Sequence, residues 1–66
     1  MLTSVEYIRY LMKIENVNQS ELARRLGCSR QLVSQNLING YQLSFDNFTK
    51  YVDALGYNLA FVPKED

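Results

Sequence analysis

The sequence predicts an all-α domain of four short helices followed by one short C-terminal β-strand. Apolar residues recur at helical spacing over four stretches, and Thr, Asn or Ser, the usual N-terminal caps, precedes each stretch. Asparagine or glycine follows three of them, where a left-handed residue commonly ends a helix. The last stretch, 57–62, is instead rich in aromatic and branched residues, which favours a strand.

The length and composition indicate one small domain that spans residues 1–66. A chain of 66 residues can bury only a small core. It has no apolar run of membrane-spanning length, no signal-peptide pattern, and a single cysteine, which argues against a disulfide scaffold. We therefore expect a cytoplasmic protein.

The first helix is predicted to begin at Ser4 and to end near Glu15. Thr3 and Glu6 have the spacing of a capping box, and Asn16 is a candidate left-handed C-cap. Its apolar face consists of Val5, Ile8, Leu11 and Met12.

Residues 18–40 read as two short helices joined by a tight turn. Asn18 caps the first helix, and with Glu21 it resembles a capping box. Gly27 ends that helix, and Ser29 caps a second one over 30–37. The apolar faces are formed by Leu22, Ala23 and Leu26, and by Leu32, Val33 and Leu37. The small Ala23 and the turn of about three residues indicate a helix-turn-helix rather than another helical hairpin.

The outward positions of the second helix carry side chains that form hydrogen bonds, and none of them is acidic. Arg and Gln suit bidentate contacts with guanine and adenine edges in the major groove. The pattern also fits the solvated face of any amphipathic helix, and that alternative stays open. The candidate base-contacting residues are Arg30, Gln31, Ser34 and Gln35.

Several segments together resemble the helix-turn-helix of Cro-like and phage-repressor regulators, also called xenobiotic-response-element-type (XRE) regulators. These segments are Gln19-Ser20-Glu21-Leu22-Ala23, Leu26-Gly27, Ser29-Arg30-Gln31 and Val33-Ser34-Gln35, and the resemblance continues through Ala54-Leu55-Gly56. It implies a lambda-repressor-like fold in which Arg30, Gln31 and Ser34 contact base edges and Gln35 contacts a base or a phosphate. It also implies phosphate contacts from Asn18 and Gln19, and from Asn39 and Tyr41 in the following loop.

The chain departs from this family at the end of the second helix. Asn36 stands where the family usually has an apolar residue, and Gly40 comes one residue later than the usual glycine. The helix is therefore expected to run one residue longer or to end differently.

After the Asn39-Gly40 turn, Leu43 is expected to point inward and Ser44 to cap the fourth helix. Gly56 ends this helix, whose apolar face consists of Phe45, Phe48, Val52 and Leu55.

The strand over 57–62 ends before Pro63 and would place Tyr57, Leu59 and Phe61 on one face. A lone strand leaves its backbone N–H and C=O groups unpaired. We therefore predict that it pairs antiparallel with the same segment of a second copy, so that these three residues form a homodimer interface. The alternative is that the segment folds back onto its own helices.

The charges are balanced overall but unevenly distributed. Net charge is zero, which argues against phosphate binding. Through Leu43, however, five basic residues outnumber three acidic ones, giving +2, and two basic against four acidic residues give −2 thereafter. The basic half contains the predicted helix-turn-helix.

The sequence favours a sequence-specific DNA-binding transcriptional regulator, a repressor that occupies an operator in double-stranded DNA. The alternative is an antitoxin-type protein-binding module that neutralises a toxin-like partner and autoregulates its operon. An enzyme is not expected, because the chain has no histidine and a lone cysteine cannot form a thiolate zinc site. We accordingly predict no cofactor and no metal.

Overall fold

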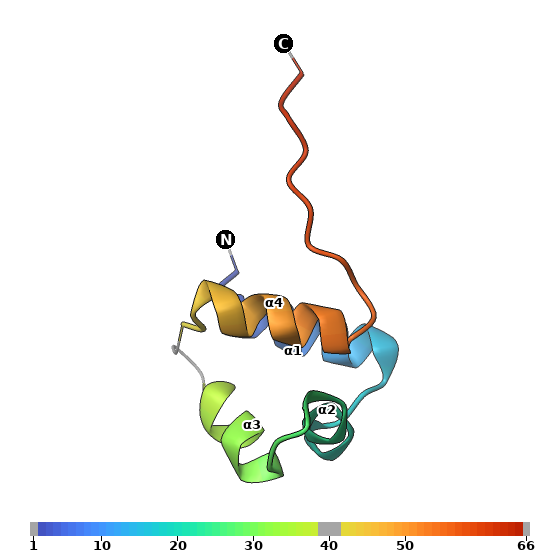
Figure 1. The fold of residues 1–66 in the computed structure, drawn as a ribbon, viewed down its shortest axis with the longest axis vertical. Helices are drawn as coiled ribbons and strands as arrows, with labels where there is room; N and C mark the ends of the chain where they lie inside the picture. The colour runs from blue at the N-terminus through green and yellow to red at the C-terminus, as the bar shows by residue number, and fades with distance from the viewer. Residues whose placement is uncertain (1, 39–41, 66) are drawn as a thin grey trace.

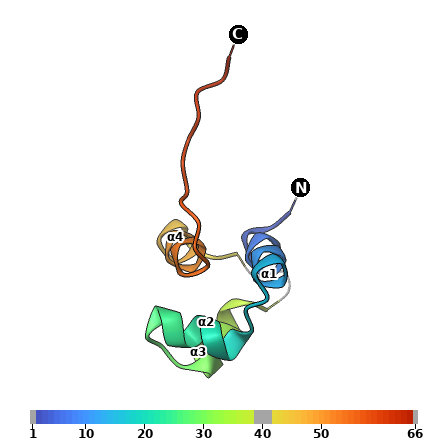
Figure 2. The ribbon, with the colours of Figure 1, turned by 90° about the vertical axis from the view of Figure 1, so that its right-hand side faces the viewer.

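The computed structural model describes residues 2–38 and 42–65, and these contain four α-helices (Figure 1). They are α1 (Ser4–Glu15), α2 (Gln19–Leu26), α3 (Arg30–Asn36) and α4 (Phe45–Ala54). Helices α1 and α4 lie side by side in one layer, and the α2–α3 pair forms a second layer beneath them (Figures 1 and 2). The prediction of an all-α arrangement of four short helices is confirmed for the described residues.

The helix ends follow from local hydrogen bonds at the predicted caps. Thr3 and Glu6 form the full capping box at the start of α1. Ser29 and Ser44 accept the backbone N–H of the residue three positions on, at 3.1 and 3.2 Å. Such a cap typically stabilises a helix by about 1 kcal/mol. Asn16 ends α1 in the left-handed conformation, with φ of 55°.

A single apolar core lies between the two layers. Its fully buried side chains are Val5, Ile8, Leu22, Val33, Leu37 and Leu55. Leu43 is 8 % exposed, so the prediction that it points inward is confirmed. Ala23 is also buried, where its small side chain lets α2 approach its neighbours closely.

Two predicted core positions are wrong. Phe45 is 61 % exposed, and Leu32 is 45 % exposed. Phe45 is the first residue of α4 and lies beyond the buried part of that helix, whereas Tyr51, only 4 % exposed, takes the inward position. Leu32 lies at the rim of a hollow that Tyr51 also lines. The helical spacing is correct, since Val33 and Leu37 of α3 and Val52 and Leu55 of α4 are buried as predicted, and only Leu32 and Phe45 are wrongly assigned to the core.

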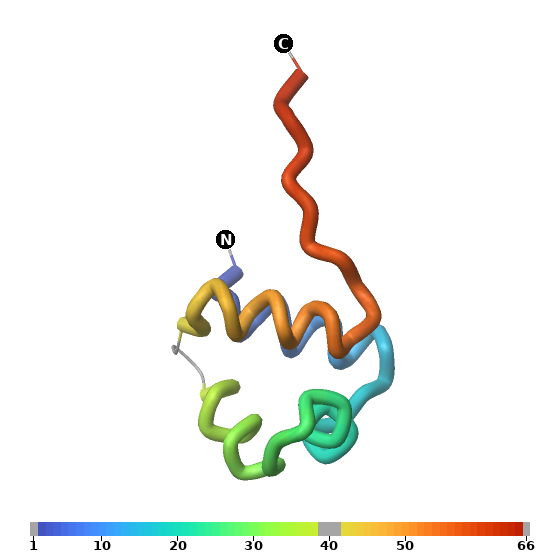
Figure 3. Tube along the Cα trace, viewed as in Figure 1, coloured from blue at the N-terminus to red at the C-terminus, as the bar shows by residue number. Residues whose placement is uncertain are grey.

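The predicted strand over 57–62 is wrong for the single chain. The described residues form no strand, and this segment runs out as an extended tail beyond the α1–α4 layer (Figure 3). The physical reason is that a strand needs a hydrogen-bonded neighbour, and no other extended segment lies beside it in the described part of the chain. The tail keeps contact with its own helices through Leu59, which lines a groove there, and through Phe61, whose ring stacks on Phe45 at 6.4 Å.

None of the described helices is both long and apolar enough to cross a membrane.

Candidate nucleic-acid interface

The turn between α2 and α3 fixes the angle between the two helices. Gly27 adopts the left-handed conformation with φ of 72°, as predicted. Its N–H donates to Arg24 O at 3.3 Å, and the Cys28 N–H donates to Ala23 O at 3.0 Å, which together form a Schellman motif. Ser29 then caps α3 immediately, so the second helix begins at a defined angle to the first.

The predicted base-contacting residues form one exposed surface of α3, which we call the reading face and define as Arg30, Gln31, Ser34 and Gln35. All four side chains are exposed. Arg30, Gln31 and Ser34 line one open hollow, whereas Gln35 lies outside that hollow. The reading face belongs to the layer farthest from the C-terminal tail (Figures 1 and 2).

The predicted phosphate contacts are only partly described by the structure. The Asn18 side-chain carbonyl accepts the Glu21 N–H at 2.8 Å, which leaves the amide NH₂ group as a donor. Gln19 is half-buried in the first turn of α2, where free N–H groups favour an anion. Asn39 and Tyr41 lie outside the described residues.

The Glu21 side chain does not complete the predicted capping box with Asn18. Its carboxylate instead forms ion pairs with Arg24 and Arg25, and we call this arrangement the Glu21 fork. The Glu21 carboxylate accepts hydrogen bonds from Arg24 Nε at 3.0 Å and from Arg25 Nε at 2.9 Å. These bonds, that of Arg24 first, lower the pKa of Glu21 to about 2. Arg25 also donates to Ala54 O at 3.0 Å, which ties α2 to the end of α4.

Comparison with protein families agrees with this geometry. A helix-turn-helix family model (HTH_3) matches residues 8–62, which is most of the chain. The chain belongs to the Cro/C1-type (XRE) helix-turn-helix family. Membership implies DNA binding and transcription regulation, and proteins of this family typically have no catalytic activity. No curated protein and no solved structure matches the chain significantly.

The departure from the family pattern has a structural basis. Helix α3 ends at Asn36, with Leu37 as its cap at φ of −102°, so it ends differently rather than running longer. The Asn36 side-chain amide donates to the Tyr51 hydroxyl at 2.9 Å. Asn36, which stands where an apolar residue was expected, is thus held by a hydrogen bond to α4.

Arg9 is a residue near the interface that the sequence did not single out. Its guanidinium donates to Leu37 O through both Nε and Nη2, the Nε bond being 3.2 Å. This contact joins residues 28 positions apart in the chain. No local sequence pattern signals it, because it depends on how α1 packs over the end of α3.

Proposed function

We propose that this helix-turn-helix protein is a sequence-specific transcriptional repressor that reads the major groove with α3. The observation that carries the proposal is the reading face, which is exposed, free of acidic groups and set at a fixed angle by the Gly27 turn. In this arrangement α3 lies in the groove and α2 crosses the backbone. Repressor action then follows from occupation of an operator.

The division of contacts follows from the chemistry of the side chains. Arg30 and Gln31 can each make a bidentate contact with a base edge, and Ser34 can donate or accept one hydrogen bond. Asn18 and Gln19 would hold the phosphates at the start of α2, and Asn39 and Tyr41, which follow α3 in the sequence, remain the other proposed phosphate contacts. Because Glu21 already pairs two arginines, electrostatic attraction to arbitrary DNA is small. Binding should therefore depend strongly on the base sequence.

The decisive experiment is selection of bound duplexes from a random DNA pool by the full-length protein. The affinity of the selected duplex is then compared with that of a scrambled duplex of the same composition. We expect clear preference for the selected sequence, and a protein that binds both equally would contradict the proposal.

We further propose that the protein acts as a homodimer joined through Tyr57, Leu59 and Phe61. The tail exposes apolar side chains, with Phe61 84 % and Val62 85 % exposed. An apolar groove between α1 and α4 lies at its base and is lined by Tyr7, Leu11, Phe48, Val52, Tyr57, Asn58 and Leu59. An exposed apolar segment and an apolar groove on one chain can complement those of a second copy about a two-fold axis.

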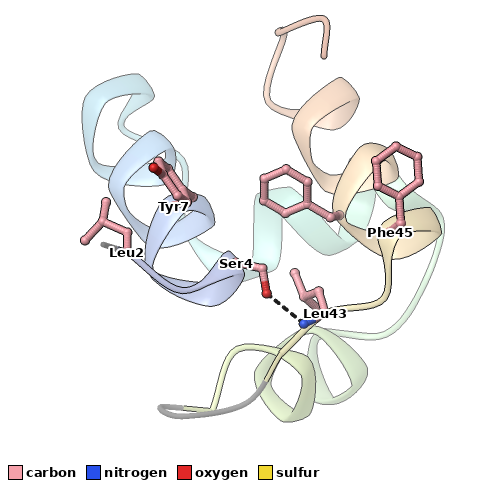
Figure 4. A pocket seen from close by; sticks show the side chains of 6 residues that line it. Leu2, Ser4, Tyr7, Leu43 and Phe45 are labelled. Atoms are coloured by element: carbon pink, nitrogen blue, oxygen red, sulfur yellow. Dashed lines mark hydrogen bonds between the residues drawn. The ribbon is translucent and has the colours of Figure 1, made fainter. Parts of the chain in front are cut away.

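A second hollow extends the same groove toward the start of α1. Tyr7 and Phe48 line both hollows, and Leu2, Ser4, Leu43 and Phe45 complete the second one (Figure 4). Pairing of two tails over these surfaces would remove the apolar groups from water. Binding to successive major grooves would require the dimer to hold its two copies of α3 about 34 Å apart.

Light scattering on the full-length protein and on a chain ending at Gly56 tests the dimer. We expect the full chain to be dimeric at tens of micromolar and the shortened chain to be monomeric. A monomeric full chain, or a shortened chain that stays dimeric, would rule out pairing through the tail.

A second candidate function is that of an antitoxin, whose tail would bind a toxin-like protein instead of a second copy. The observation in its favour is that the exposed tail belongs to the half of the chain with charge −2. Co-expression with the protein encoded by the adjacent gene, followed by purification, distinguishes the two. Stoichiometric co-purification that is lost when the chain ends at Gly56 would support the antitoxin role.

A further inference from the structure

Helix α3 is attached to the rest of the molecule unevenly. Its start is joined to α2 by the Schellman turn, and α2 is the helix against which it mainly packs. At its last turn, two polar contacts reach the other layer. Arg9 of α1 donates to Leu37 O, and Tyr51 of α4 accepts from Asn36 Nδ2.

A helix of this length needs such contacts to hold its orientation. Helix α3 has only seven residues, and isolated helices shorter than about 12 residues are marginal in water. Its end is not closed by a left-handed residue, since the Leu37 cap has φ of −102°. The carbonyl groups of the last turn therefore need other donors. The cationic Arg9 supplies one and also favours the negative end of the helix dipole.

The two contacts differ in how firmly their donor or acceptor is fixed. Tyr51 is 4 % exposed, so its ring is held by core packing and its hydroxyl is a fixed acceptor for Asn36. Arg9 is exposed but binds one oxygen through two nitrogens, which restricts its direction. Together they link the end of α3 to both helices of the other layer.

We propose that Arg9 and Tyr51 are positioning residues for DNA reading, which set the orientation of α3 without touching the duplex. The inference rests on the proposed function, because it assigns these residues to the same reading face. Bidentate base contacts have strict geometry, so a small rotation of α3 weakens the correct site more than a scrambled one. Loss of either contact therefore lowers discrimination between sequences.

The test compares the full-length parent with Arg9→Gln, Arg9→Lys and Tyr51→Phe, using the duplex selected by the parent and its scrambled form. Lys13→Gln is the matched control, since it removes the same charge from an exposed position of the same helix. We expect Arg9→Gln to lower the ratio of the two affinities about fivefold, comparable to loss of one base contact. Arg9→Lys should recover part of the ratio, and Tyr51→Phe should lower it about twofold. Lys13→Gln should weaken both duplexes equally and leave the ratio unchanged.

Hydrogen exchange without DNA gives a second readout. The Leu37 N–H donates to Val33 O at 3.0 Å in the last turn of α3, and it should exchange faster in Arg9→Gln than in the parent. If the parent discriminates between the duplexes and the Arg9 and Tyr51 variants keep the same ratio, the positioning role is wrong and the proposed function stands. If the parent does not discriminate, the proposed function fails, and this inference fails with it.

Discussion

The hydroxyl of Tyr57 donates a hydrogen bond of 2.7 Å to a carboxylate oxygen of Glu15. This contact joins the first residue of the extended tail to the last residue of α1, 42 positions apart in the chain. It lies at the point where the tail leaves the helices.

The Tyr57–Glu15 contact should produce a pH dependence at the alkaline end. Because the neutral hydroxyl donates to Glu15, the pKa of Tyr57 is raised above its ordinary value, with burial adding to the effect. The contribution to stability is therefore complete below about pH 10 and is lost as the pH rises through the folded-state pKa. Urea unfolding between pH 8 and pH 12 should show a steeper alkaline loss for the parent than for Tyr57→Phe. Parallel profiles would contradict this, since Tyr51, whose pKa burial also raises, is present in both proteins.

Gly27 should be the least replaceable residue of the turn. A Cβ built there meets no atom within 4 Å, so the penalty comes from the backbone conformation alone, with φ of +72°. A non-glycine residue in this region costs about 1–2 kcal/mol, more for a β-branched side chain and less for Asn. Gly27→Val should therefore lower the free energy of unfolding clearly more than Gly27→Asn in thermal or urea unfolding. Equal stability of the two variants would mean that the turn can be made in another way.

The Glu21 fork should make the protein sensitive to acid. The pKa of Glu21 is lowered to about 2 by Arg24 first and then by Arg25. A depressed pKa contributes stability that is present above the unfolded value, about 4.3, and is lost as the pH falls toward 2. Glu21→Gln should therefore lose less stability than the parent between about pH 5 and pH 2, measured by urea unfolding at each pH. A variant that loses as much as the parent would show that other carboxylates dominate the acid transition.

The reading face should lose sequence preference without losing stability. Gln31→Ala should weaken binding to the selected duplex by about 1–3 kcal/mol if Gln31 makes a bidentate base contact, and Ser34→Ala should weaken it less. Arg30→Ala should also reduce the slope of log affinity against log salt by about 1 if Arg30 touches a phosphate. Fluorescence anisotropy over a salt series measures both effects, and unfolding checks that the fold is intact. If all three variants discriminate between the selected and the scrambled duplex as well as the parent does, the residues that recognise the base sequence must lie elsewhere on the protein.

Local signals determined the helix boundaries, and these could be predicted from the sequence. Caps such as Thr3, Ser29 and Gly27 act through hydrogen bonds or backbone angles within a few residues of themselves, so their meaning depends little on tertiary structure. The order of the helices and the position of the reading face followed from these boundaries.

Features that depend on packing between helices could not be predicted in the same way. Helical spacing alone does not show which of Phe45 and Tyr51 faces the core, because that depends on how α4 is rotated against the other helices. The contact between Arg9 and Leu37 also depends on packing between helices, in this case of α1 over the end of α3. The strand over 57–62 was inferred from β-forming residues, but its backbone partner is not supplied by the described part of this chain.

Helix α3, which carries the reading face, and the C-terminal tail lie at opposite ends of the molecule (Figures 1 and 2). A fluorophore, an affinity tag or a whole protein attached after residue 65 would therefore project away from a bound duplex. The domain could in this way deliver an attached cargo to a chosen DNA sequence, provided that the attachment leaves the apolar residues of the tail accessible.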